Sequence, residues 1–289
     1  MTHIKWKNIS IVIPAKNEVT SLKRILPVLQ EKFQGAQIIV INDGSTDGTE
    51  AYCSSLGVEV VTNNYSKGNG AAIKSGARKA KGDTVVFMDG DGQHKPDDIP
   101  KLIARLEQGF DMVVGARNNE SQASFGRLAA NKIYNRLATW MVGHKIPDLT
   151  SGFRAVRRKY FNKYLYMLPN GFSYPTTITM AFFRAGHAVA YEPIIAEKRE
   201  GKSHIRITHD GIRFLLIIFK VGTLYSPLKL FLPVSALLFM AGFGNYVFSY
   251  AAHGTFTNMS TLMLLSSLIV FLVGLVAEQV TTLLYRESE

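Results

Sequence analysis

The sequence predicts an α/β domain with a mostly parallel sheet, followed by an amphipathic interfacial helix and a two-helix transmembrane hairpin. Two observations predict this. Up to residue 115, short apolar stretches alternate with amphipathic segments, which is typical of a parallel α/β sheet. Residues 230–277 contain no Asp, Glu, Lys or Arg, a run long enough for two spans of about 20 residues each. We therefore expect a domain over 1–205, an interfacial helix over 206–228 and a hairpin with a short tail over 229–289.

Strands and helices are expected in alternation along the domain. Strands are expected where buried apolar residues cluster, at 8–14, 37–43, 58–62, 84–88, 111–115 and 188–194. Helices are expected where apolar residues recur at helical spacing, at 17–33, 48–56, 69–80, 95–108 and 126–142. In such sheets ligands bind beyond the carboxyl ends of the strands. Residues that follow the strands are therefore the first candidates for a functional site.

The membrane segment is expected to contain spans at 230–252 and 262–285, joined through 253–255. Arg213, Lys220 and Lys229 precede the first span and Arg286 follows the second, whereas the joining turn has no Lys or Arg. Positive residues stay on the cytoplasmic side. We therefore expect the N-terminal domain in the cytosol, with no signal peptide before it.

The segment before the spans has its own pattern. Residues 207–225 place Arg213 and Lys220 seven apart on one narrow face, which suits a helix lying in the membrane interface. Packing against the domain is the alternative. In the first span, Gly242 and Gly244 would permit close helix contact and a homo-oligomer.

The charge balance suggests an anionic partner. The chain has 33 Lys and Arg against 22 Asp and Glu, a net charge of +11. No aromatic-basic platform or recognised helix motif accompanies this charge, so nucleic acid is not expected. Many basic residues lie between 198 and 229, which favours anionic lipid headgroups, with a solvated basic face as the alternative. The single cysteine, Cys53, excludes an intrachain disulfide and agrees with a reducing compartment.

An acidic turn, DGDGQH at 89–94, follows the strand at 84–88. The glycines let the chain turn tightly, so Asp89 and Asp91 can converge on one point. With the amide carbonyl of Gln93, they suit a hard divalent cation that keeps waters and shares phosphate oxygens. Neither His94 nor Cys53 completes a zinc-binding set. The alternative is an ordinary acidic turn. Polar residues at the other strand ends favour the cation site over this alternative.

Other strand ends carry matching groups. The sequence PAKNE follows the first strand, Asp43-Gly44-Ser45 the second, and Arg117 the fifth. Together with the acidic turn, they predict a site for a ligand with a base, a ribose and phosphates. The Gly-rich stretch 66–70 lacks the P-loop spacing. It could let a helix N-terminus approach a pyrophosphate or form a tight turn, and both readings stay open.

Five motifs in order resemble those of family 2 glycosyltransferases, and within them the polyprenyl-phosphate sugar synthases of the dolichol-phosphate mannose synthase type. They are P-x-x-N-E at 14–18, D-G-S-T-D-G-T at 43–49, D-x-D-x-Q-H at 89–94, G-x-R at 115–117 and D-x-T-S-G-F-R at 148–154. The resemblance implies a GT-A type nucleotide-sugar-binding domain. It also implies roles for individual residues.

On the donor side, the resemblance implies one set of contacts for each part of a UDP- or GDP-linked sugar. The nucleoside would be contacted by Pro14, Lys16 and Glu18, and the base and ribose by Ile41 and Asp43. The ribose, sugar and diphosphate would face Asp89, Gly90 and Asp91. Asp91 and Gln93 would bind Mg²⁺ or Mn²⁺. The phosphates would be approached by Arg117, Lys198 and Arg199. The usual Asp-Asp pair is here Asn42-Asp43.

On the acceptor side, the resemblance implies that Arg127 meets the phosphate of a polyprenyl or dolichyl phosphate, with Asn131 where a serine is expected. Asp148 would belong to the catalytic set with Asp89 and Asp91, in a positioning role. A phosphate monoester is mostly dianionic at neutral pH and needs no strong base to attack. The implied reaction is metal-dependent and inverting, at the cytoplasmic leaflet. The alternatives are a hydroxyl acceptor, such as a glycolipid or polysaccharide, and a non-catalytic nucleotide-sugar-binding scaffold.

Overall fold

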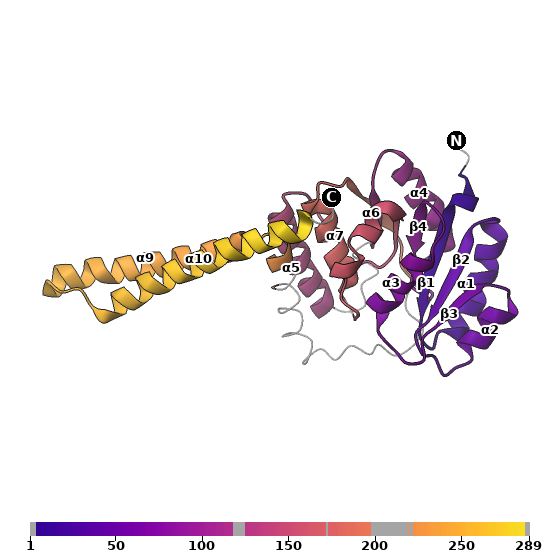
Figure 1. Cartoon of the computed structure of the whole chain (residues 1–289), viewed down its shortest axis with the longest axis horizontal. Coiled ribbons are helices and arrows are strands. Elements are labelled where there is room, and N and C mark those ends of the chain that lie inside the picture. The colour runs from indigo at the N-terminus through magenta and orange to yellow at the C-terminus, as the bar shows by residue number, and fades with distance from the viewer. Residues whose placement is uncertain (1–3, 118–124, 172, 198–218, 220–221, 287–289) are drawn as a thin grey trace. The chain divides into compact units, whose positions relative to one another are not determined.

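The computed structural model describes residues 4–117, 125–171, 173–197, 219 and 222–286, with side chains over the same ranges except at 125–131 and 286. The chain divides into two compact units, Met1–Arg206 and Ile207–Glu289. The first is an α/β domain and the second is dominated by two long helices (Figure 1).

A seven-stranded sheet in the order β3-β2-β1-β4-β6-β5-β7 forms the centre of the first unit. All neighbouring strands are parallel except β6, which runs antiparallel to β4 and β5. The strands are β1 Ile9–Ala15, β2 Gln37–Asn42, β3 Glu59–Thr62, β4 Thr84–Phe87, β5 Met112–Arg117, β6 Arg154–Arg157 and β7 Val189–Ile194. The helices are α1 Val19–Lys32, α2 Thr49–Ser55, α3 Asn69–Lys79, α4 Ile99–Glu107, α5 Phe125–Val142, α6 Arg158–Lys163 and α7 Tyr174–Arg184. Short 3-10 helices are η1 Trp6–Asn8, η2 Pro96–Asp98 and η4 Leu165–Met167.

The expected α/β architecture is confirmed, and the expected strands and helices agree with the observed ones to within about two residues. The helix expected at 95–108 begins as η2 and continues as α4. Among the strands and α-helices of the described part of the first unit, β6, α6 and α7 were not expected. Arginines at both ends of β6 interrupt the apolar pattern of a strand, so the sequence did not indicate one there. The β-branched threonines of α7 have low helix propensity, so its sequence did not indicate a helix.

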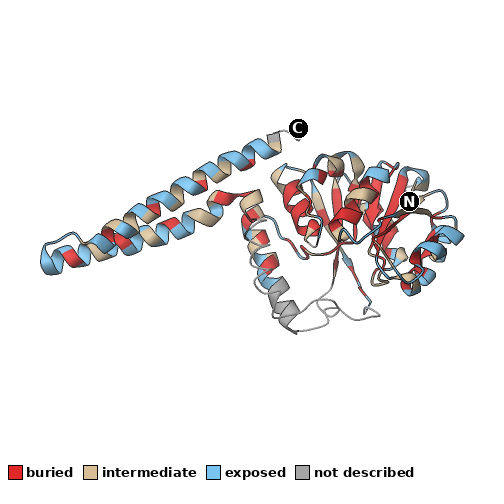
Figure 2. Ribbon diagram, turned by 60° about the horizontal axis from the view of Figure 1, so that its bottom comes forward, coloured by how far each residue is buried: buried red, intermediate tan, exposed pale blue. Residues whose placement is uncertain are grey.

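Both faces of the sheet are covered, so β1 is buried at all seven positions (Figure 2). One face packs on the apolar stripes of α1 and α4, including Leu26 and Leu102. On the other face α3 lies very close to the sheet. A Cβ atom on Gly76 would lie 2.2 Å from Cγ1 of Val12. This tight packing fixes the strand ends that carry the candidate site.

The second unit contains α9, Pro227–His253, and α10, Asn258–Arg286. Both helices are long and apolar enough to cross a membrane, with mean hydropathies of 1.6 and 2.4. Only 11% and 17% of their most apolar windows are buried, unlike the core helices of a soluble protein. Two helices of the length and composition expected for the spans are thus present. Most of the expected interfacial helix lies outside the described residues and stays a prediction.

Small residues recur every seven positions along the contact between α9 and α10, and all of them are buried. They are Ser235, Gly242 and Ser249 on α9, and Ser260, Ser267, Gly274 and Thr281 on α10. The hydroxyl of Ser235 donates to the carbonyl of Ser267 at 2.9 Å, and that of Ser267 donates back at 3.0 Å. A seven-residue repeat is the pattern of helices that wind around each other with a left-handed twist.

Gly242 belongs to this internal contact. A Cβ atom there would lie 2.9 Å from Cβ of Met263, so Gly242 is used within the hairpin and is not a surface for a second copy. The close helix contact expected at Gly242 is thus confirmed, between α9 and α10 of one chain, and the homo-oligomer stays a prediction. At the other end, the Glu278 carboxylate accepts hydrogen bonds from Leu228 N at 3.2 Å and Ser226 Oγ at 3.3 Å, which caps the start of α9.

Candidate active site

The carboxyl ends of β1, β2, β4 and β5 lie along one edge of the sheet, because these strands are parallel to one another. Beyond β4 the chain stays beside β1, with Gly90 N donating to Pro14 O at 3.2 Å. A Cβ atom on Gly90 would lie 3.0 Å from that oxygen, so glycine permits the approach. The acidic turn therefore emerges next to the end of β1.

Asp89 is held from two sides. His94 Nε2 lies 3.5 Å from Oδ2 of Asp89, and the His94 ring stacks on Phe153 with centroids 4.9 Å apart. Burial by itself would raise the pKa of Asp89, but the hydrogen bond and charge of His94, with the charges of Arg117 and Arg154, hold that pKa below its usual range. The carboxyl is therefore an anion, and its side chain remains 30% exposed, so a ligand can reach it.

Gly152 forms the other wall around Asp89. A Cβ atom on Gly152 would lie 2.6 Å from Oδ2 of Asp89. The carbonyl of Gly152 accepts a hydrogen bond from the buried Tyr174 hydroxyl at 3.1 Å. Arg154, which is fully buried, donates to Ser151 O, to Pro175 O and to Thr179 Oγ1. This scaffold holds the 151–152 backbone against Asp89, and sequence reasoning missed it although both Gly152 and Arg154 belong to the last motif.

Gly152→Ala tests whether this wall positions Asp89. The added methyl has no room beside the carboxylate, so we expect a fall in kcat of roughly tenfold to a hundredfold, because small displacements of a reacting group are costly. The melting temperature should change little. Gly171→Ala is the matched control, since a Cβ there meets nothing within 4 Å. Equal activities of the two variants would show that Gly152 does not set the position of Asp89.

Arg117 and Asp148 form a bidentate ion pair. Arg117 Nε donates to Oδ2 of Asp148 at 2.8 Å, and one terminal nitrogen donates to Oδ1 at 3.1 Å and to Thr150 Oγ1 at 2.7 Å. Asp148 also accepts from the backbone nitrogens of Thr150 and Ser151. Burial would raise the pKa of Asp148, but Arg117 and the backbone nitrogen of Thr150 lower it. Such a carboxylate is a poor proton acceptor. Arg117 was expected just after a strand ending at residue 115, and it is instead the last residue of β5.

Arg117 lies among three carboxylates. Although burial alone would lower its pKa, Asp148 raises it, and Asp89 and Asp91 add to the effect. The two acids of the turn therefore both lie near the same guanidinium. That the two carboxylates converge on one point stays a prediction.

Asp43 was expected to contact the base and ribose, but its carboxylate is buried and hydrogen-bonded to the protein. Its buried carboxylate accepts four hydrogen bonds, from Asn63 Nδ2 at 2.9 Å, Ser66 Oγ at 2.8 Å, Lys67 N at 2.8 Å and Gly68 N at 2.9 Å. Burial would raise the pKa of Asp43, but these donors lower it. In this structure the carboxylate organises the loop after β3.

The remaining donor-side candidates near β1 and β2 differ in accessibility. Ile41 is fully buried beneath α3 and has no exposed surface for a nucleotide, so a direct contact from its side chain is not supported. Pro14 is buried in β1, Lys16 is exposed, and Glu18 is partly exposed at the start of α1. Asn17 Oδ1 accepts from Thr46 N at 2.8 Å, which ties the loops after β1 and β2 together.

The Gly-rich stretch before α3 forms a tight contact with another loop. Gly70 N donates to Gly171 O at 3.1 Å, and Ala71 N donates to Asn170 O at 2.9 Å. A Cβ atom on Gly70 would lie 2.0 Å from Pro169 O. Since a neighbouring backbone takes these nitrogens, they are not open to a pyrophosphate. Of the two readings of this stretch, the structural turn is the one observed.

Gln93 connects the acidic turn to the residues after β7. Glu197 N donates to Gln93 O at 2.9 Å, and Gln93 Nε2 donates to Glu197 O at 3.2 Å. The chain therefore enters the basic segment beginning at Lys198 from beside the acidic turn. Lys198 and Arg199 themselves lie outside the described residues, as do the side chains of Arg127 and Asn131 in α5.

The residues of the acidic turn fit a divalent cation that takes part of its ligands from a substrate. Within the described ranges, no group of three or more His, Cys, Asp or Glu side chains could hold a metal alone. Asp89, Asp91 and Gln93 offer two carboxylates and an amide oxygen, which are hard ligands. Asp91 Oδ1 also accepts from Gln93 N at 3.2 Å, which fixes the turn. The set suits Mg²⁺ or Mn²⁺ sharing diphosphate oxygens.

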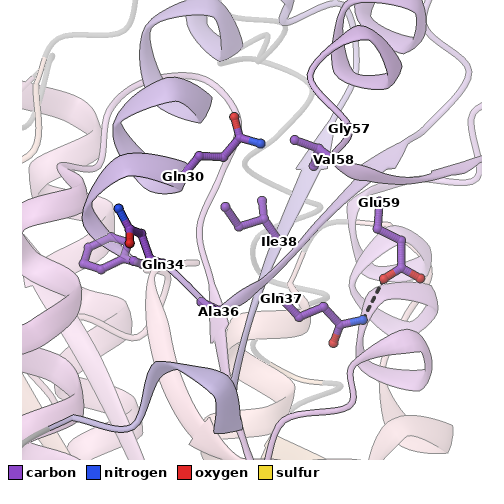
Figure 3. A pocket seen from close by; sticks show the side chains of 10 residues that line it. Gln30, Gln34, Ala36, Gln37, Ile38, Gly57, Val58 and Glu59 are labelled. Atoms are coloured by element: carbon purple, nitrogen blue, oxygen red, sulfur yellow. Dashed lines mark hydrogen bonds between the residues drawn. The ribbon is translucent and has the colours of Figure 1, made fainter.

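A separate cavity of about 460 Å³ lies at the opposite edge of the sheet (Figure 3). It is lined by residues near the amino ends of β2 and β3, where Gln37 Nε2 donates to Glu59 Oε2 at 2.7 Å. None of the candidate site residues lines it. This cavity is therefore separate from the candidate site at the carboxyl ends of the strands.

An α/β domain with polar groups at the carboxyl ends of its strands has the layout of a ligand-binding α/β domain, and comparison with known proteins identifies the family. Residues 10–165 match Glycosyl transferase family 2, and residues 226–283 match the GtrB C-terminal hairpin. The chain belongs to glycosyl transferase family 2. It is a glycosyltransferase with a GT-A-like fold and a C-terminal membrane hairpin.

Similar proteins extend over nearly the whole chain. The undecaprenyl-phosphate 4-deoxy-4-formamido-L-arabinose transferase of Proteus mirabilis is 27% identical, covering 96% of this chain and 90% of its own. The protein of the same name from Aeromonas hydrophila is 29% identical, covering 97% and 90%. Glucosyl-3-phosphoglycerate synthase from Mycobacterium tuberculosis, solved with Mn²⁺ and UDP, superposes with a TM-score of 0.59 at 22% identity, covering 74% of this chain and 80% of its own. That likeness shows a common fold.

Proposed function

We propose that this protein transfers a sugar from a nucleotide diphosphate sugar to a polyprenyl phosphate at the cytoplasmic face of a membrane, with inversion at the anomeric carbon. The observation that carries the proposal is the Arg117–Asp148 pair beside the acidic turn. A hydroxyl acceptor needs a base, and Asp148 is a poor base because it is ion-paired with Arg117. A phosphate acceptor is already an anion at neutral pH. The names of the relatives, which are undecaprenyl-phosphate sugar transferases, support the same acceptor.

In the proposed reaction the chain has two tasks. It must stabilise the leaving nucleoside diphosphate and hold the acceptor phosphate in line with the anomeric carbon. Arg117 supplies fixed positive charge next to the acidic turn, where charge develops on the leaving oxygen. Asp148 keeps the guanidinium in place through its two hydrogen bonds. Asp89, held by His94 and Gly152, faces the ribose and sugar.

Asp91 and Gln93 would hold Mg²⁺ or Mn²⁺, with Asp89 nearby; when bound, the cation would act as a Lewis acid toward the diphosphate. Lys198 and Arg199 follow Glu197, which pairs with Gln93, and we assign them to the diphosphate. On the acceptor side, we assign Arg127 and Asn131 in α5 to the lipid phosphate. On the donor side, Lys16 and Glu18 would border the nucleoside, with Pro14 and Asp43 supporting the loops around it.

The proposal is tested by incubating the full-length protein in nanodiscs with Mg²⁺ or Mn²⁺, a short polyprenyl phosphate and a panel of nucleotide sugars. The panel includes UDP- and GDP-linked hexoses and UDP-linked 4-deoxy-4-formamido-L-arabinose. We expect one donor to give a lipid-linked sugar of inverted anomeric configuration, detected by mass spectrometry and NMR. Transfer only to a hydroxyl acceptor, or to no acceptor with any donor, would contradict the proposal.

A further inference from the structure

The outward face of α5 combines exposed apolar and basic side chains. Ile133 is 67% exposed and Trp140 is 51% exposed, although both are large and apolar. They lie seven residues apart, so they share one face of the helix, and the exposed Arg136 lies between them. In the described part of the first unit, large exposed apolar side chains are few: Tyr65, Ile133, Trp140, Tyr166 and Ile195. Two of them therefore fall on one short helical surface.

The charged side chains of α5 that the structure describes are all positive. Lys132 and Arg136 are exposed on α5, and Lys145 is exposed just after it. The sequence from 125 to 147 contains no Asp or Glu. A surface with a tryptophan, an aliphatic side chain and cations but no acids complements the headgroup region of an anionic bilayer. A protein partner would normally offer acidic side chains in return and leave a more mixed surface.

The inner face of α5 is attached to the candidate site. Asn135 Nδ2 donates to Pro147 O, and Asn135 Oδ1 accepts from Leu149 N at 3.1 Å. These two contacts bracket Asp148, the partner of Arg117. The buried Tyr134 hydroxyl donates to Thr176 Oγ1 of α7 at 3.2 Å. A surface that binds the outer face of α5 therefore also fixes the distance between that surface and the Arg117–Asp148 pair.

We propose that the outer face of α5, formed by Lys132, Ile133, Arg136 and Trp140, lies in the headgroup region of an anionic lipid bilayer. Contact with lipid removes the apolar area of Ile133 and Trp140 from water and pairs the cations with lipid phosphates. The inference rests on the proposed function, because only a lipid-borne acceptor gives the enzyme a reason to hold its soluble unit on the membrane. It adds a second attachment besides the hairpin.

The chain contains only two tryptophans, which makes a direct test simple. Trp6 packs on Phe33, with ring centroids 4.4 Å apart, in the 3-10 helix that precedes β1. The variant Trp6→Phe leaves Trp140 as the only tryptophan, and Trp140→Phe leaves Trp6. Each variant is placed in lipid discs of phosphatidylglycerol and phosphatidylcholine whose scaffold contains no tryptophan, with acyl chains either brominated near the headgroup or unbrominated.

We expect brominated lipid to lower Trp140 emission roughly twofold, as for an interfacial tryptophan, and to leave Trp6 emission unchanged. Trp140 emission that is equal in both kinds of disc would overturn the inference. Blue-shifted emission that bromine does not affect would mean that another protein surface, such as a second copy, covers α5, and would equally overturn it.

A second measurement separates this inference from the proposed function. Ile133→Ser/Trp140→Ser should lower kcat/KM for a long polyprenyl phosphate in discs about tenfold, because membrane attachment supplies proximity, and leave kcat/KM unchanged for a short acceptor in detergent. Equal losses with both acceptors would overturn the inference. If wild type shows bromine quenching but no transfer to any polyprenyl phosphate, the membrane contact stands and the proposed function fails.

Discussion

Replacing Asp91 with alanine is expected to lower kcat by about 10³-fold or more, because the charge that develops on the leaving diphosphate loses its cation. The other proposed ligands, Asp89 and Gln93, remain, so the cation affinity should fall as well. Binding of Mn²⁺ in the presence of a nucleoside diphosphate, followed by electron paramagnetic resonance, measures this without turnover. Wild-type activity should disappear in chelator and return with Mg²⁺ or Mn²⁺.

The matched control is Asp97→Asn. Asp97 is an exposed acid a few residues after the turn, and it forms a surface ion pair with Lys32. Such pairs contribute little to stability, so activity and Mn²⁺ binding should both match wild type. An Asp91→Ala variant that binds Mn²⁺ and turns over like the control would mean that the acidic turn is not the cation site.

Replacing Asp148 with asparagine is expected to cost about 3 kcal/mol of stability, because it leaves the mostly buried Arg117 without its charge partner. Activity should fall with it, since Arg117 loses one side of its bidentate contact. Stability can be followed in a Trp140→Phe background through the fluorescence of Trp6, which is half-buried against Phe33 in the first unit. The double variant Arg117→Gln/Asp148→Asn removes both charges. It should be less destabilised than the sum of the single variants, yet remain inactive.

The ion pair also predicts a pH dependence. The pKa of Asp148 is lower in the folded protein than in an unfolded chain, where it is about 3.9. Its stabilising effect is therefore complete above that value and is lost as the pH falls through the lowered folded pKa. Wild type should lose melting temperature below about pH 4, and Asp148→Asn should lose less.

The rate profile distinguishes positioning from proton transfer. If Asp148 positions Arg117, Asp148→Asn should lower kcat at every pH and leave the shape of the profile unchanged. Loss of the acidic limb of the profile in this variant would identify Asp148 as a base and favour a hydroxyl acceptor.

Much of the fold could be predicted from the sequence because its elements carry strong local signals. The strands of the parallel sheet are apolar on both faces, and α1 and α4 have clear apolar stripes. The position of the acidic turn followed from the rule for strand ends. β6 could not be predicted in this way, because Arg154 is fully buried by long-range contacts with Pro175 and Thr179.

The site was predicted less completely than the fold. The acids of the turn and Arg117 were expected at one edge, and they lie there. The partners of Asp43 were not predictable, because Asn63, Ser66 and Gly68 lie on a separate loop that only the folded chain brings to it. The same holds for Gly70, whose neighbour Pro169 is distant in the sequence. A motif gives the residue types at a site, and tertiary contacts decide which of them face the ligand.

The reciprocal serine bonds and the Glu278 cap lock α9 and α10 against sliding past each other. A 27-residue helix is about 40 Å long, whereas the hydrocarbon layer of a bilayer is about 30 Å thick. Where the apolar stretch of such an anchor is longer than the hydrocarbon layer, the anchor leans or thickens the surrounding lipid, because its length is fixed. Bilayer thickness would then change the tilt of the hairpin without any ligand or covalent modification.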